Sequence, residues 1–378
     1  MKMDIAFVTT RLTELDAQGN FSDLTVKRLK EKSSGRMSIY TFAYERPAID
    51  GVDIHFLGGS NCHSIKTNAT SLLNTVKNAR ELAKYDLLLL AGPDMGAIPA
   101  AHMAKRYNPG LKIMWVYHGL TPPEYISGAR DRMLTRIRKA AYLFSMKRSG
   151  LVQTFSRYIK SELVGSGVDR DKIVPMPFGI DIEAFSNARG NYVRSKHGLD
   201  GKFIVLYVGR LAALKRVDDL ITAISEMKDK NIGLIIVGGG PEREKLEDIS
   251  KRLGVEDIVK FAGKVPDHDL PGYYASCDVW ATASRHEGFC VPIVEAMAAG
   301  KPVIVPEIAA MPETAGDGGL TYPAGNINAF KDAIMHMMEN RGLYESLSKQ
   351  ARERSGLYEI HGVLDRYANF ILSFGEKR

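Results

Sequence analysis

Short apolar runs alternate with segments of helical length from one end of the chain to the other. The first series of runs is Ile5–Thr9, Asp53–Leu57, Leu87–Ala91, Ile113–Tyr117, Leu151–Thr154 and Ile173–Pro175. The second is Phe203–Val208, Gly233–Val237, Ile258–Ala262, Val279–Thr282 and Pro302–Val305. Runs of four to six apolar residues between helices are typical of parallel strands buried on both faces. The pattern predicts a doubly wound α/β architecture.

Two such series predict two Rossmann-like domains. The polar segment Phe178–Asp200 lies between them and is interpreted as the connection. A chain of 378 residues is long enough for two domains that each bury a core. The tail, Tyr358–Phe374, is predicted to be a final helix.

Composition excludes several classes of protein. With 45% hydrophobic and 25% charged residues, the chain is not globally disordered. Its longest apolar runs are too short for a transmembrane helix, and the N-terminus has no signal-peptide pattern. Cys62, Cys277 and Cys290 form neither a disulfide framework nor a zinc pattern. We expect a cytoplasmic protein.

The positive charge is concentrated in the first half of the chain. Residues 1–190 hold 27 Lys+Arg and 18 Asp+Glu, a net +9, whereas residues 191–378 hold 24 and 26, a net −2. Within segment 130–148, basic residues that include Arg136, Arg138 and Lys139 interleave with apolar residues at helical spacing. A solvated surface helix, a helix at an anionic membrane and a nucleic-acid contact are open readings; sparse aromatics count against nucleic acid.

Three segments of the second half carry residues suited to a phosphorylated ligand. After Phe203–Val208, Gly209 permits a turn, Arg210 offers a planar fork to phosphate oxygens and Lys215 adds a point charge. After the next strand, the glycines from Gly238 permit close backbone approach at a helix start. Taken singly, each segment could equally be an ordinary turn.

The third segment places two glutamates eight residues apart. Glu287 is predicted in a loop and Glu295 in the first turn of the following helix, so both would face one site. Ionised carboxylates are strong acceptors for sugar and ribose hydroxyls, and the amides of Phe289–Val291 could meet a phosphate. A solvated loop residue and a first-turn acid are the plain alternatives.

Taken in order, these segments resemble family 4 of the retaining glycosyltransferases, which have the GT-B fold. The resemblance runs from about Met176 to Phe330 and includes PFGIDIEAF, GRLAALKR, GGGPERE, FAGKVPDHDLPGYYASCDVWATAS (261–284), EGFCVPIVEAMAAGKPVI and PETAGDGGLTYPAGN. It implies two Rossmann-like domains facing a cleft, with a C-terminal helix that crosses back. The expected domains are 1–180 with about 360–378 on the acceptor side, and 181–359 on the donor side.

The resemblance also implies roles for individual residues. Arg210 and Lys215 would bind the donor pyrophosphate, Glu287 the transferred sugar and Glu295 the ribose hydroxyls. The remaining donor-side positions are Gly209, Gly238, Lys264, Val265, Phe289, Cys290 and Val291. His118, in VYHGLTPPE, would lie near the reacting sugar carbon. In the first domain Gly19 is the only glycine of a weakened acceptor-side loop, and Cys290 replaces the glycine common in the family. We interpret Cys290 as a packing or selectivity residue.

The expected reaction moves a sugar from a UDP- or GDP-sugar to an acceptor hydroxyl with retention. Fixed cations and helix amides would stabilise the leaving diphosphate, so neither a metal nor a cofactor is expected. The acceptor would be a lipid, a glycan or a small molecule, with an anionic membrane surface as a further partner. Two alternatives stay open: an enzyme of this fold that acts on small soluble sugars, and a non-catalytic sugar-nucleotide binder.

Overall fold

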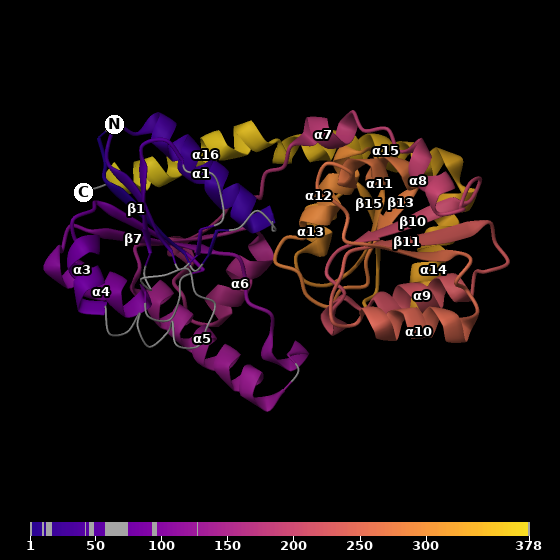
Figure 1. Cartoon of the computed structure of the whole chain (residues 1–378), viewed down its shortest axis with the longest axis horizontal. Coiled ribbons are helices and arrows are strands. Elements are labelled where there is room, and N and C mark those ends of the chain that lie inside the picture. The colour runs from indigo at the N-terminus through magenta and orange to yellow at the C-terminus, as the bar shows by residue number, and fades with distance from the viewer. Residues whose placement is uncertain are drawn as a thin grey trace. The chain divides into compact units, whose positions relative to one another are not determined.

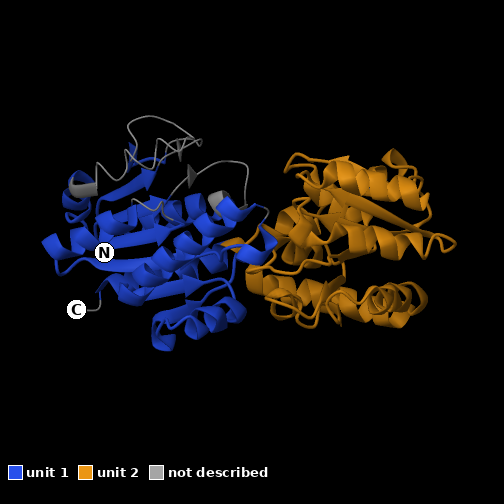
Figure 2. Cartoon of the chain, turned by 90° about the horizontal axis from the view of Figure 1, so that it is seen from below, with its two compact units in different colours: residues 1–178, 361–378 blue, residues 179–360 orange. Residues whose placement is uncertain are grey.

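The computed structural model describes residues 2–9, 11–12, 17–41, 43–44, 49–56, 75–92, 97–126 and 128–376. The chain divides into two compact units, shown in different colours in Figure 2. Unit 1 comprises residues 1–178 and 361–378, and unit 2 comprises residues 179–360. The expected boundaries lie within two residues of these positions.

Unit 1 is built on a seven-stranded parallel sheet. Its strands, in sheet order, are β5 (Val52–Phe56), β3 (Met37–Thr41), β1 (Ile5–Thr9), β6 (Leu87–Ala91), β7 (Lys112–Tyr117), β8 (Leu151–Thr154) and β9 (Ile173–Pro175). The predicted strands are present here, and β3 was missed because Ser38 interrupts its apolar run. A two-residue ladder joins β2 (Arg11–Leu12) to β4 (Ala43–Tyr44).

Helices cover both faces of this sheet. Helices α1 (Ala17–Lys32) and α16 (Ile360–Glu376) lie on one face (Figure 1). The other face carries α3 (Thr75–Leu82), α4 (Ala97–Tyr107), α5 (Ala129–Arg148) and α6 (Arg157–Gly165). Their apolar side chains, such as Leu82, Ile98 and Met146, pack with strand residues in one buried cluster. This burial is the main stabilising contribution to unit 1.

Unit 2 repeats the plan with a six-stranded parallel sheet. The strand order is β12 (Val259–Gly263), β11 (Ile232–Val237), β10 (Phe203–Val208), β13 (Val279–Ala281), β14 (Val303–Pro306) and β15 (Gly319–Tyr322). The order reverses direction between β10 and β13. In open α/β sheets ligands bind beyond the carboxyl ends of the strands at such a switch point.

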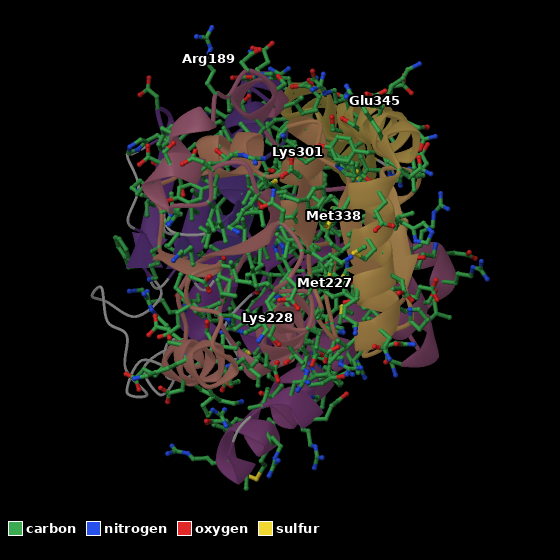
Figure 3. The ribbon with its side chains drawn as sticks, turned by 90° about the vertical axis from the view of Figure 1, so that its right-hand side faces the viewer. Arg189, Met227, Lys228, Lys301, Met338 and Glu345 are labelled. Atoms are coloured by element: carbon green, nitrogen blue, oxygen red, sulfur yellow. The ribbon has the colours of Figure 1, made fainter. Side chains whose placement is uncertain are left out.

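The helices of unit 2 also form two layers (Figure 1). One face carries α9 (Val217–Ser225), α10 (Arg243–Leu253) and α14 (Ile327–Glu339). The other carries α7 (Ile182–Ser186), α8 (Asn191–Lys196), α11 (Leu270–Ser276), α12 (Val291–Ala298), α13 (Met311–Ala315) and α15 (Arg341–Ser355). Met227 and Met338, labelled in Figure 3, contribute to the apolar cluster under α9 and α14. The two sheets confirm the predicted α/β architecture.

The interpretation of Phe178–Asp200 as the connection between the domains is wrong for most of its length. Most of it is an integral part of unit 2, where α7 and α8 pack on α11 and α12. Val193 and Leu199 are completely buried, and Arg194 forms an ion pair with Asp278 at 2.8 Å. The segment looks polar because such pairs and helix caps are made by polar side chains. The chain passes between the units only at 178–179 and at 360–361.

Candidate functional site

Three loops interlock at the carboxyl ends of β10, β11 and β12. The amide of Gly209 donates to the Val237 carbonyl at 3.0 Å, and that of Gly238 donates to the Gly263 carbonyl at 2.7 Å. Gly238 has φ +134°, and a Cβ there would lie 1.9 Å from the Gly209 carbonyl oxygen. Only glycine fits this position. Its amide is already bonded, so Gly238 supports the loop packing rather than offering a free donor.

Lys215 and Glu287 meet at the switch point. The short helix η3 (Ala213–Lys215) follows β10, and Glu287 lies in the loop after β13. The Lys215 Nζ donates to Glu287 Oε1, and both side chains are over four-fifths buried. The Arg285 amide donates to the Leu214 carbonyl at 2.9 Å, which ties the two loops together. The sequence predicted both residues at one site, but not that they would pair with each other.

Arg210 projects from the same edge of the sheet. Its side chain is exposed and forms no ion pair within the described residues. The backbone beneath is held by Tyr207, a fully buried residue whose hydroxyl donates to the Arg210 carbonyl at 3.2 Å. A fixed backbone under an uncommitted guanidinium suits capture of a multiply charged anion.

Glu295 lies one turn into α12 and is partly buried. Tyr274 of α11 donates its hydroxyl to Glu295 Oε2 at 2.5 Å. Burial raises the pKa of Glu295 to about 7, while the Tyr274 bond acts in the opposite direction and Asp267 reinforces the rise. The carboxyl group therefore titrates near neutral pH. Tyr274 was not among the predicted site residues, although it lies within the stretch 261–284 that carried the resemblance.

The loop between the two glutamates ends in a left-handed residue. Cys290 has φ +71° and precedes α12. In the first turn of that helix Pro292 has no amide, and the Ile293 amide donates to the Cys290 carbonyl at 3.1 Å. Burial raises the pKa of the Cys290 thiol well above the usual value, which disfavours the reactive thiolate. Phe289 is buried against Tyr358, with ring centroids 5.6 Å apart. Val291 is the first residue of α12.

The remaining donor-side positions follow β12. Lys264 is exposed, and its side chain lies beside Gly239, where a Cβ would be 3.4 Å from the Lys264 Cε. Val265 is partly exposed next to it. Asp267 and Asp269 form an Asp-x-Asp sequence nearby, as do Asp169 and Asp171 in unit 1. Over the described residues, no three His, Cys, Asp or Glu side chains come within metal-binding range.

His118 lies in unit 1, directly after β7. Its ring stacks on Phe155 with centroids 4.7 Å apart, and burial lowers its pKa to about 4, so the imidazole is neutral at pH 7. Its buried Nδ1 has no hydrogen-bond partner among the described residues. Gly19, predicted in a loop, lies instead within the first turn of α1. Cys62 lies outside the described residues, and Cys277 and Cys290 are free thiols.

Helix α5 packs through its C-terminal part and leaves most of its apolar residues between 133 and 144 exposed. Tyr142, Ser145 and Met146 are its buried residues. Met133, Ile137 and Phe144 are each at least half exposed, and at 100° per residue they fall on the side roughly opposite Tyr142. The basic residues Arg136, Arg138 and Lys139 are also exposed. By the same rotation Arg136 lies next to the stripe, whereas Arg138 and Lys139 lie nearer the side of Tyr142.

Comparison with known proteins extends the resemblance over both units. The model of glycosyl transferases group 1 matches residues 192–354, and that of glycosyltransferase family 4 matches residues 26–184. The sequence resemblance had been traced only through the second half, so the first half is closer to the family than expected. Over the part of the chain that the structure describes, no helix is long and apolar enough to cross a membrane.

Individual relatives agree with these models. A GDP-mannose-dependent α-(1-6)-phosphatidylinositol monomannoside mannosyltransferase of Mycolicibacterium smegmatis is 32% identical over 48% of this chain and 52% of its own length. The chain thus spans about half the length of that relative. A GDP-mannose-dependent α-mannosyltransferase of Mycobacterium tuberculosis is 27% identical over 80% of this chain and 78% of its own.

Solved structures match the fold over nearly the whole chain. The HepE protein of Anabaena in complex with UDP has a TM-score of 0.78 at 20% identity, covering 99% of this chain and 100% of its own. Sucrose-phosphate synthase of Thermosynechococcus elongatus has a TM-score of 0.77 at 19% identity, covering 98% and 99%. With both halves matched by their family models, the chain belongs to the group 1, family 4 glycosyltransferases and has the GT-B fold.

Proposed function

We propose that this protein transfers a sugar from a nucleoside diphosphate sugar to an acceptor hydroxyl with retention and without a metal. The observation that supports the proposal is the set of groups at the β10–β13 switch point. They are Arg210, which forms no ion pair within the described residues, the Lys215–Glu287 pair, and Glu295, whose carboxyl has a pKa of about 7. The names of the mycobacterial relatives make GDP-mannose the first donor to test. UDP-sugars come second, since HepE was solved with UDP.

Charge stabilisation is the main contribution that these residues would make. Arg210 and Lys215 would bind the diphosphate and offset the negative charge that develops as the sugar–phosphate bond breaks. The Lys215–Glu287 contact keeps a buried cation paired before the donor arrives, because an isolated buried charge is costly. With the donor bound, the Lys215 ammonium would contact a phosphate oxygen instead of Glu287, and Glu287 would accept hydrogen bonds from the sugar hydroxyls.

The two glutamates would act as ligands rather than as an acid–base pair. Glu295 would accept from the ribose hydroxyls, and the leaving phosphate would take the proton of the acceptor hydroxyl. In unit 1, His118 is neutral and therefore suited to a neutral hydrogen bond with the sugar rather than to charge stabilisation.

The first test is donor binding and transfer. Melting temperatures are measured with GDP, UDP, ADP and their sugar conjugates, each with and without EDTA. We expect one nucleotide to stabilise the protein despite EDTA, and Lys215→Ala to lower kcat/KM about 10²- to 10³-fold. Lys228→Ala removes an exposed lysine of unit 2 (Figure 3) and serves as the control. Stabilisation without transfer to any acceptor would favour the non-catalytic binder, and no shift at all would refute the donor site.

We further propose that α5 binds an anionic membrane that holds the acceptor. The helix exposes an apolar stripe of Met133, Ile137 and Phe144 on the side away from its packed face. Exposed arginines and lysines flank the stripe, so the helix offers apolar insertion together with headgroup charge. Each basic residue near an anionic surface contributes about 1 kcal/mol.

Vesicle sedimentation tests this surface. Replacing Arg136, Arg138 and Lys139 by Gln should weaken binding to phosphatidylglycerol vesicles about 100-fold and leave nucleotide binding unchanged. The control replaces three basic residues of α10, Lys245, Lys251 and Arg252, by Gln. Equal binding by wild type and the α5 variant would refute the membrane proposal and favour a soluble acceptor.

A further inference from the structure

The Tyr274–Glu295 hydrogen bond joins two helices of unit 2. Tyr274 is completely buried on α11, and its ring makes an edge-to-face contact with Phe185 of α7, with centroids 5.5 Å apart and planes at 75°. A tyrosine side chain has few torsions, and full burial fixes them. The hydroxyl therefore has a defined position, 2.5 Å from Glu295 Oε2.

The bond leaves most of the acceptor capacity of Glu295 unused. A carboxylate has two oxygens with about four lone-pair directions. Within the described part of the chain, Tyr274 supplies the only side-chain hydrogen bond to Glu295, so Oε1 has no protein donor. Because α12 fixes its backbone and Tyr274 fixes one oxygen, the carboxylate is preorganised to accept from a pair of adjacent hydroxyls.

The surroundings of Glu295 disfavour its ionised form, so the hydrogen bond from Tyr274 affects its charge. Among the described residues, the titratable groups besides Tyr274 whose charge acts on the carboxyl are the Asp267 carboxylate before α11 and the Cys290 thiol before α12. Neither supplies a positive charge, and burial favours the protonated acid. A protonated carboxyl would lose part of its capacity to accept from two hydroxyls. The Tyr274 hydroxyl is thus the group that favours the ionised form.

We infer that Tyr274 is a positioning residue for the donor: it holds the Glu295 carboxylate as an ionised, two-oxygen acceptor for the ribose hydroxyls. This inference rests on the proposed function, since it needs a nucleotide at the switch point. Tyr274 does not touch the donor and acts only through Glu295.

Calorimetric titration of Tyr274→Phe with GDP and with UDP tests the inference. For the nucleotide that binds wild type, we expect about tenfold weaker binding at pH 7 and a smaller loss at pH 9, where Glu295 ionises in both proteins. The kcat at saturating donor should stay within about threefold, because the reacting atoms are untouched. The 2′,3′-dideoxy form of the same nucleotide should bind both proteins equally.

Tyr273→Phe is the matched control. Tyr273 is the neighbouring buried residue of α11, and its hydroxyl contacts Lys196 at 3.3 Å and His197 at 3.4 Å instead of Glu295. The Tyr273→Phe variant should bind the nucleotide with the affinity of wild type. In a Glu295→Gln background, Tyr274→Phe should change affinity less than about twofold, as expected when two residues act as one unit.

The outcomes separate the two proposals. If Tyr274→Phe binds the nucleotide as wild type does at every pH, the inference is wrong and the proposed function stands. If Tyr274→Phe weakens binding of the dideoxy nucleotide as much as binding of the normal nucleotide, the substitution acts through the fold, and the inference is again wrong. If none of GDP, UDP and ADP binds wild type, the proposed function fails and the inference fails with it.

Discussion

Glu295 should make unit 2 less stable as the pH rises. Its pKa is raised from an ordinary 4.5 to about 7, so the folded state holds a proton that the unfolded state releases. The contribution of this group to stability is therefore fully present below pH 4.5 and is lost as the pH rises through 7. A pKa difference of about 2.5 corresponds to about 3 kcal/mol, or about 2 kcal/mol after allowance for solvent contact of a partly exposed side chain.

Glu295→Gln removes this titration and keeps the size of the side chain. The free energy of unfolding of the variant, relative to wild type, should rise by about 2 to 3 kcal/mol between pH 4 and pH 8. At any single pH, the difference in free energy of unfolding between the variant and wild type also contains a constant offset. That offset depends on how well the amide replaces the carboxyl as the acceptor of the Tyr274 hydroxyl. The pH dependence does not depend on that offset, and it is the quantity to compare.

The chain contains a convenient reporter for this measurement. It has two tryptophans, Trp115 in β7 of unit 1 and Trp280 in β13 of unit 2, and both are buried. In a Trp115→Phe background, fluorescence follows unit 2 alone during urea unfolding at each pH. Glu345→Gln changes an exposed glutamate on α15, labelled in Figure 3, and is the control. A difference between Glu295→Gln and wild type that is flat from pH 4 to pH 8 would refute the reasoning.

Two further predictions concern the backbone of the site. Gly238→Ala should destabilise unit 2 by about 3 kcal/mol or more because its Cβ would meet the Gly209 carbonyl, whereas Gly239→Ala meets only the flexible Lys264 side chain and should be nearly neutral by urea unfolding. Cys290→Val should lower the free energy of unfolding by at least about 1 kcal/mol, because a branched side chain is poorly tolerated at positive φ. Cys290→Gly should unfold with a free energy within about 1 kcal/mol of wild type in the same urea measurement. If Cys290→Gly were the less stable of the two variants, φ would not limit this position.

The sequence was informative about the sheets because buried parallel strands are nearly continuous apolar runs. Strands such as Phe203–Val208 are reproduced residue for residue. Strand β15, Gly319–Tyr322, was missed because it is short, begins with Gly and carries an exposed Thr321. The order of strands along the chain then brings Arg210, Lys215 and Glu287 to one edge, as the motif spacing indicated.

The contacts within the site were not predictable in the same way. No periodicity reports that Lys215 pairs with Glu287, or that Tyr274 of one helix reaches Glu295 of the next, because both depend on packing between distant segments. For a related reason the spacing of α5 left a solvated helix and a membrane-facing helix both open: spacing defines the face of a helix but not the side on which it packs. The roles of these residues stay predictions until donor binding is measured.

The way in which the chain enters and leaves unit 2 has an engineering consequence. The Ile180 amide donates to the Tyr358 carbonyl at 2.9 Å, and Ile180 and Glu359 form a parallel bridge, so the two ends of this unit lie side by side. Unit 2 is thus topologically an insertion with adjoining ends. A circular permutant could join residue 360 to residue 179 through a few glycines and open a new terminus at the exposed turn near Asp229. The same adjacency allows the half that carries the switch-point residues to be exchanged between related enzymes as a cassette.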